Sequence, residues 1–63
     1  MQVGDHIREL RYKRKLSQQA LADLLNISKT RLGRIERGDL KASFDEIVKI
    51  AEFFDVAVDD LAR

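Results

Sequence analysis

The sequence predicts an all-α fold made of five short helices in one small domain. Apolar residues recur at helical spacing, and no stretch alternates between apolar and polar residues for long enough to predict a strand. Serine, asparagine and glycine residues that favour helix ends separate these segments, and proline is absent. A length of 63 residues leaves room for one domain, so we expect residues 1–63 to fold as a single unit.

The composition argues against several functional classes. The chain has no cysteine, which excludes disulfides and thiolate metal sites, and its single histidine, His6, makes a zinc site unexpected. We expect His6 at the surface or at a helix cap, and we expect no cofactor or metal. No apolar run is as long as a membrane span, and the first residues lack a signal-peptide pattern, so we expect a cytoplasmic protein with no membrane partner.

Five segments carry the helical pattern. The first is expected at about Asp5–Lys15, with Asp5 as its N-cap, Ile7, Leu10 and Leu16 facing inward, and Tyr12 half-buried in packing rather than stacked on bases. Ser17 caps the second, about Gln18–Leu25, and Ser28 caps the third, about Lys29–Arg37. Asn26 tolerates the left-handed backbone that ends a helix, and Gly38 is suited to end the next one.

Ser43 and Glu46 form a capping-box pattern that starts the fourth helix, about Phe44–Phe54. The expected inner stripe of that helix is Phe44, Ile47, Ile50, Ala51 and Phe54. The fifth segment, about Val58–Arg63, is a short helix with Leu61 facing inward.

Charge is distributed unevenly along the chain. Residues 1–41 hold ten Lys and Arg against five Asp and Glu, a net charge of +5, whereas residues 42–63 hold two cations against six acids, a net charge of −4. A basic half beside an acidic half suggests a surface that faces a polyanion such as nucleic acid. Solvated helix faces are the alternative explanation.

Residues 17–38 form a helix, a three-residue turn and a second helix, the pattern of a helix-turn-helix. At 100° per residue, Leu32 and Ile35 define the inner side of the third helix. The opposite side, which we call the outer arc, carries no acid and consists of Lys29, Thr30, Gly33, Arg34 and Arg37. At Gly33 the missing side chain would let the backbone approach base edges; the alternative is an exposed glycine that only costs stability.

The stretch LSQQALADLLNISKTRLGRIERG, residues 16–38, resembles the phage repressor/Cro-type helix-turn-helix domain of bacterial and phage regulators. Ile7-Arg8-Glu9-Leu10-Arg11, Ile50-Ala51 and Asp59-Asp60-Leu61 extend the resemblance over nearly the whole chain. The resemblance implies a compact five-helix lambda-repressor-like domain with a central helix-turn-helix. It implies base contacts in the major groove by Lys29, Thr30 and Arg34, sugar–phosphate or base contacts by Gln18 and Ser28, and a partly buried ion pair between Arg11 and Glu36. For Arg11 and Glu36, an ordinary surface ion pair is the alternative.

The chemistry of these side chains suits DNA. Arg34 and Lys29 can donate to guanine O6 and N7, and Thr30 offers a methyl group to thymine. Further cations could bind phosphates without regard to sequence: Lys13, Arg14, Lys15, Arg37 and Lys41. For residues 13–15 a role in complementing the helix dipole is equally open.

One helix contacts few base pairs, so we expect a homodimer on a pseudo-palindromic operator. Apolar residues left over near the C-terminus are the candidate dimer contacts: Leu40, Phe53, Val58, Leu61 and Ala62. The expected function is a DNA-binding transcriptional regulator that represses by occluding a promoter. Activation through RNA polymerase contact, an antitoxin-like or restriction-modification controller role, and a protein-interaction module that retains the fold stay open. No nucleophile–base pair or phosphate loop points to an enzyme, and the chain could be a complete Cro-like regulator or the N-terminal domain of a longer protein.

Overall fold

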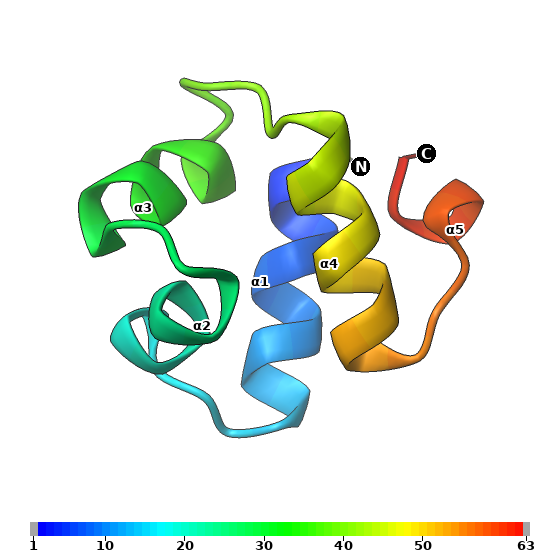
Figure 1. Ribbon diagram of the computed structural model, residues 1–63, viewed down its shortest axis with the longest axis horizontal. Coiled ribbons are helices and arrows are strands. Elements are labelled where there is room, and N and C mark those ends of the chain that lie inside the picture. The colour runs from blue at the N-terminus through cyan, green and yellow to red at the C-terminus, as the bar shows by residue number, and fades with distance from the viewer. Residues whose placement is uncertain (1, 63) are drawn as a thin grey trace.

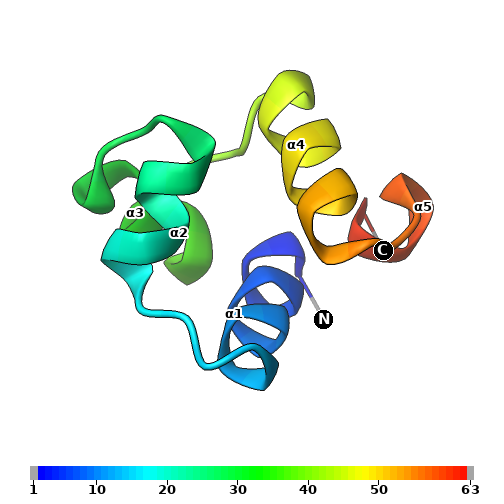
Figure 2. The ribbon, with the colours of Figure 1, turned by 60° about the horizontal axis from the view of Figure 1, so that its bottom comes forward.

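In the computed structural model, which describes residues 2–62, the chain folds into five α-helices and no strand within that range. They are α1 (Val3–Lys13), α2 (Gln18–Leu25), α3 (Lys29–Arg37), α4 (Phe44–Phe54) and α5 (Val58–Ala62). Figures 1 and 2 show α2 and α3 on one side of α1, with α4 and α5 on the other. The predicted all-α class is confirmed, and α2, α3 and α4 have the predicted bounds. Arg63, predicted in the last helix, lies outside the described residues.

The first helix begins two residues earlier than predicted. Gln2 is its N-cap, and Asp5 occupies the third helical position, where its carboxylate Oδ2 accepts a hydrogen bond from the Gln2 backbone N–H at 3.1 Å. The prediction of Asp5 as N-cap was therefore wrong, because the chain continues the helix through Val3 and Gly4. The helix ends at Lys13 rather than Lys15, since Lys15 adopts a left-handed backbone with φ of 54°.

A core of aliphatic side chains joins all five helices. The most deeply buried large residues come one from each helix, at 1% exposure or less: Ile7, Leu21, Leu32, Ile50 and Leu61. The N-terminal turn of α1 packs directly onto the backbone of α3 at Gly4. A Cβ there would lie 2.5 Å from the carbonyl oxygen of Glu36 and closer still to that of Ile35, so only glycine allows the two helices this approach.

Two aromatic predictions fail. Phe44, predicted in the inner stripe of α4, is 74% exposed. The buried line of α4 is instead Glu46, Ile50 and Phe54, spaced by four residues, and Phe44 lies about 200° from Glu46 on the helical wheel. Tyr12, predicted half-buried, is 62% exposed, with the Arg11 guanidinium 4.8 Å from its ring centre.

No helix among the described residues is long and apolar enough to cross a bilayer.

Candidate nucleic-acid interface

The turn between α2 and α3 is fixed by backbone conformation and by caps. Asn26 ends α2 in the left-handed region, with φ of 59°, as predicted. The Ile27 N–H then donates to the Ala22 carbonyl at 3.0 Å, and Ser28 Oγ accepts the Arg31 N–H at 3.0 Å to start α3. Ala22 is fully buried at this crossing, where a small side chain lets the helices approach. This geometry presents one side of α3 to solvent.

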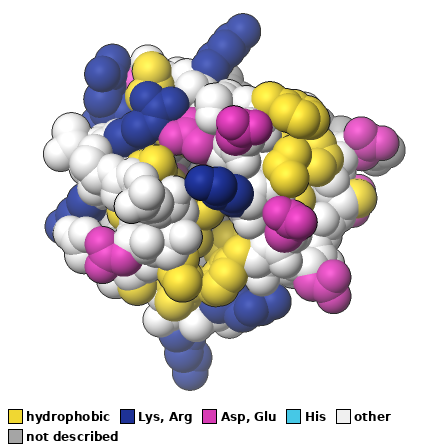
Figure 3. Space-filling view, viewed as in Figure 1, with side chains coloured by type: hydrophobic (Ala, Val, Ile, Leu, Met, Phe, Trp, Pro, Cys, Tyr) yellow, Lys and Arg dark blue, Asp and Glu magenta, His cyan; other side chains and the backbone are white. Residues whose placement is uncertain are grey.

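The outer arc is exposed at four of its five predicted positions. Lys29, Thr30, Arg34 and Arg37 are exposed, whereas Leu32 and Ile35 are buried against the core. Figure 3 shows the uneven charge on one face of the molecule, with Lys and Arg side chains mainly on the side of α3 and at the lower end, and Asp and Glu side chains mainly over α4 and α5. The exposed arc therefore combines the positive charges of its Lys and Arg side chains with hydrogen-bond donors on all four side chains.

Gly33 is buried, and its predicted exposure on the outer arc was wrong. A Cβ at this position would lie 3.4 Å from Arg37 Nη1 and 3.7 Å from Gln18 Nε2. The helical wheel accounts for the inner side of α3, but it does not include side chains that reach across α3 from α2 and from the next turn. Both distances are ordinary van der Waals contacts, so an alanine would fit beneath these two side chains.

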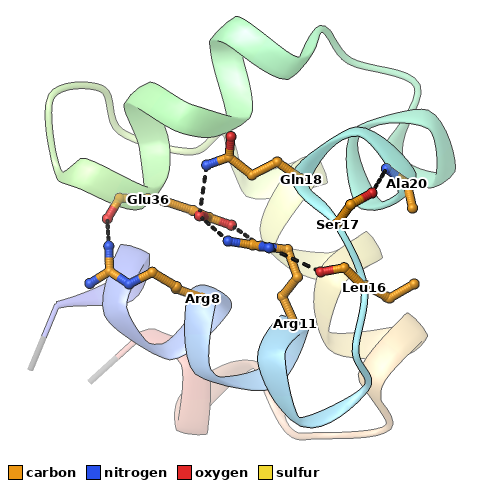
Figure 4. Close-up of polar contacts among 7 residues, drawn as sticks. All are labelled: Arg8, Arg11, Leu16, Ser17, Gln18, Ala20 and Glu36. Atoms are coloured by element: carbon orange, nitrogen blue, oxygen red, sulfur yellow. Dashed lines mark hydrogen bonds and ion pairs between the residues drawn. The ribbon is translucent and has the colours of Figure 1, made fainter.

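Arg11 and Glu36 form a buried, two-pronged ion pair between α1 and α3 (Figure 4). Arg11 Nε donates to Glu36 Oε2 at 2.8 Å and Nη2 donates to Oε1 at 3.0 Å, while the two side chains are only 8% and 2% exposed. The hydrogen bonds with Glu36 raise the pKa of Arg11 against the opposing effect of burial, so its guanidinium stays charged. The surface-pair alternative is excluded by this burial.

Gln18 joins the same network. Its Nε2 donates to Glu36 Oε1 at 3.0 Å, and Arg11 Nη1 donates to the Leu16 carbonyl at 2.9 Å, so the start of α2 is tied to both α1 and α3 (Figure 4). Arg8, which the sequence did not single out, donates to the Glu36 carbonyl at 3.4 Å and to Asp5 at 2.7 Å. Gln18 is therefore half-buried and bound within the protein at the edge of the candidate interface.

A second ion pair, between Arg31 and Glu46, was not predicted. Arg31 Nε donates to Glu46 Oε2 at 2.6 Å and Nη2 donates to Oε1 at 2.8 Å, joining α3 to the first turn of α4. The bonds from Arg31, aided by those from Ser43, lower the pKa of Glu46 to about 2 although burial opposes this. The wheel places Arg31 beside Ile35 at the edge of the core, but it contains no information on which α4 residue lies opposite.

The predicted phosphate-binding cations are in different situations. Lys13, Lys15 and Lys41 are exposed, and Arg37 is exposed with Asp39 Oδ2 3.3 Å from its Nε. Arg14 is exposed as well, and its guanidinium carbon lies 5.9 Å and 5.6 Å from the ring centres of Phe53 and Phe54 at the C-terminal end of α4. It also makes a long hydrogen bond of 3.5 Å to the Phe54 carbonyl.

The predicted dimer contacts do not all reach the surface. Leu40, Phe53 and Val58 are half-buried and Ala62 is exposed, but Leu61 is 1% exposed and belongs to the core, so its assignment as a dimer contact was wrong. Leu61 is the buried residue of the short last helix, which packs against α1 and α4. A groove of about 500 Å³ lies nearby, with a largely apolar lining that includes Val3, Leu40, Ala42, Ile47 and Ala62.

A helical core that holds a short turn and an exposed, acid-free cationic helix face defines a helix-turn-helix domain. The sequence pattern of the helix-turn-helix family matches residues 7–61, and the chain belongs to this family.

Individual relatives agree with that assignment. An HTH-type transcriptional regulatory protein of Thermococcus kodakarensis is 40% identical over 55 residues, which cover 87% of this chain but 17% of that protein. The restriction-modification controller protein C.AhdI of Aeromonas hydrophila is 36% identical with a TM-score of 0.84, covering 94% of this chain and 89% of that one. SinR, a master regulator for biofilm formation solved in complex with DNA, is 28% identical with a TM-score of 0.83, covering 94% and 95%.

Proposed function

We propose that this chain binds double-stranded DNA in a sequence-specific manner and regulates transcription, with α3 inserted in the major groove. The observation that carries the proposal is the exposed, acid-free arc of Lys29, Thr30, Arg34 and Arg37 on a helix held by one buried and one partly buried ion pair. A rigidly held helix matters because base contacts discriminate only when the donors stay in register with the base edges.

The side chains of this arc have different proposed roles. Arg34 and Lys29 donate to guanine O6 and N7, Thr30 contacts a thymine methyl, and Arg37 binds the backbone. Lys13, Lys15 and Lys41 are exposed and supply phosphate contacts, joined by the helix N-termini at Gln18 and Ser28. Gly33 lies beneath Gln18 and Arg37, where an alanine would also fit, and the exposed Arg14 adds a further phosphate contact.

We further propose a homodimer that occupies a pseudo-palindromic operator and represses by blocking a promoter. Two recognition helices must lie about 34 Å apart, one turn of DNA, and this requires a symmetric contact between domains. The apolar groove bordered by Leu40 and Ala62 suits a second copy of this chain, since both residues are apolar and accessible. A strictly monomeric species in sedimentation, with and without operator, would refute the dimer. The role is non-enzymatic and cytoplasmic in this proposal.

One specific observation favours a second candidate. The likeness to C.AhdI combines 36% identity, above the 28% of SinR, with coverage of most of both chains, which suits a restriction-modification controller. Such a role still requires operator binding, so the two candidates share the same interface and differ in the genes that are regulated.

Random-oligonucleotide selection at a stated salt concentration tests the proposal. Recovery of an inverted repeat supports it and gives the half-site spacing, whereas no enrichment over the input pool would point to a protein-interaction module. Arg34→Ala is expected to lose about 1–3 kcal/mol of discrimination at one base pair, and Lys13→Ala to weaken all sequences about equally. Identical effects of these two variants would contradict the assigned roles.

A further inference from the structure

The ion pair between Arg31 and Glu46 has the geometry of a clamp. Two nitrogens of Arg31 bind two oxygens of Glu46 at 2.6 Å and 2.8 Å, so the planar guanidinium is fixed in both distance and orientation. Glu46 is itself held: its Oε1 accepts the Ser43 backbone N–H at 2.7 Å, and its own N–H donates to Ser43 Oγ at 3.1 Å. With a side chain only 10% exposed, Glu46 is a rigid anchor at the start of α4.

The Arg31–Glu46 pair ties the first turn of α3 to α4, a link that the contacts from α1 do not provide. Gly4 and Arg11 of α1 bind the C-terminal half of α3, through the backbone at Ile35 and the carboxylate of Glu36. Arg31 lies in the first turn of α3, directly after Lys29 and Thr30. The connection between α3 and α4 runs over residues 38–43 and is irregular, so Arg31 is the side chain that links the first turn of α3 to α4 by ionic hydrogen bonds.

We propose that Arg31 and Glu46 are positioning residues that set the orientation of α3 in the major groove, and that sequence discrimination depends on their two-pronged bond. The inference rests on the proposed DNA-binding function and deepens it. Arg31 touches no base in this arrangement. Its effect passes through the placement of Lys29 and Thr30, two positions and one position before it, and of Arg34, one turn after it.

Two conservative variants isolate the geometry from the charge. Arg31→Lys retains the positive charge but cannot form the planar fork. Glu46→Gln retains the shape and an oxygen that can accept from the Ser43 N–H, because glutamine also serves in capping boxes, but it cannot bind Arg31 as a charged pair. Glu52→Gln, an exposed change on the same helix, is the matched control.

Each variant is measured for affinity to the selected operator, to single-base-pair variants of that operator and to unrelated DNA, over a range of salt. Discrimination between operator and single-base-pair variants is expected to fall about tenfold in Arg31→Lys and in Glu46→Gln, a size usual for coupled neighbours. For Arg31→Lys, the affinity for unrelated DNA and the salt dependence of DNA binding should both match those of the wild type. The double variant Arg31→Lys/Glu46→Gln should lose no more discrimination than either single variant. Glu52→Gln should discriminate between the sites as the wild type does.

Three results would overturn the inference. Unchanged discrimination in variants that circular dichroism shows to be folded would show that the clamp does not set α3. If Arg31→Gln weakened binding to all sequences and reduced the salt slope by about one, while Glu46→Gln bound normally, Arg31 would be a phosphate contact instead. A wild-type protein without selective binding would refute the proposed function itself. Arg31 is 38% exposed, so Arg31→Lys is expected to fold even if Glu46→Gln does not, and it decides the question alone.

Discussion

Replacing Glu46 by glutamine should destabilise the domain at neutral pH and lose that effect in acid. The pKa of Glu46 falls from its ordinary value of 4.5 to about 2 in the folded protein, chiefly because of its hydrogen bonds from Arg31. At 1.36 kcal/mol for each pKa unit, this difference corresponds to at most about 3 kcal/mol. Because the Arg31 side chain is 38% exposed and solvent screens the pair, we expect about 1–2 kcal/mol at pH 7.

The pH range follows from the direction of the shift. The folded pKa lies below the unfolded one, so unfolding takes up a proton at Glu46 and the stabilisation is complete above about pH 4.5–5. It is lost as the pH falls towards 2, with more than half gone by about pH 3. An effect of this size matters, because a chain of 63 residues has a total stability of about 3–9 kcal/mol.

Urea unfolding followed by circular dichroism, at pH 7, 5, 4 and 3, measures the effect. The stability difference between wild type and Glu46→Gln should be constant from pH 7 to 5 and should shrink below that, while exposed Glu52→Gln stays within about 0.5 kcal/mol of the wild type at pH 7. A difference that persists unchanged at pH 3 would refute the reasoning, since it would not come from the charge on Glu46.

The other predictions concern packing and DNA. Gly4→Ala should cost about 1–3 kcal/mol in urea unfolding, because its Cβ would meet the rigid backbone of α3, and wild-type stability would contradict the close approach. Gly33→Ala should instead gain about 0.5–1 kcal/mol in the same assay and leave site preference unchanged, because its Cβ finds ordinary contacts; a loss of stability would show that Gln18 and Arg37 cannot yield. Leu61→Ala should cost about 2–5 kcal/mol in thermal unfolding, and a small cost would argue against its place in the core. The logarithm of the DNA affinity should fall linearly with the logarithm of salt concentration, by about 0.9 for each phosphate bound, and a flat titration would argue against phosphate contacts.

Local signals predicted the helices well. Ser17, Ser28 and Ser43 each accept the predicted N-cap hydrogen bond, and Asn26 and Gly38 adopt the left-handed backbone expected of them. These features depend on residues within one turn of each other, so the sequence contains the information directly. The start of α1 was missed because Gln2 is a weaker cap signal than Asp5.

Contacts between helices were predictable only where a resemblance supplied them. The Arg11–Glu36 pair was expected on that ground, whereas the Arg31–Glu46 pair depends on how α4 lies against α3, which no local pattern encodes. The predicted exposure of Gly33 and the predicted burial of Phe44 were wrong for a related reason. A helical wheel identifies the sides of one helix, but burial depends on which neighbour covers each side.

Eight of the nine residues of α3 separate into two groups, and the ninth is the buried Gly33. The side chains that hold the helix in place are Arg31, Leu32, Ile35 and Glu36, and the exposed ones are Lys29, Thr30, Arg34 and Arg37. Within the exposed group, Arg37 forms a solvent-exposed ion pair with Asp39. Variation at these four positions should therefore leave the scaffold intact. A combinatorial library confined to them offers a way to redirect the domain to new sequences, and natural descendants could diverge in target by the same few changes.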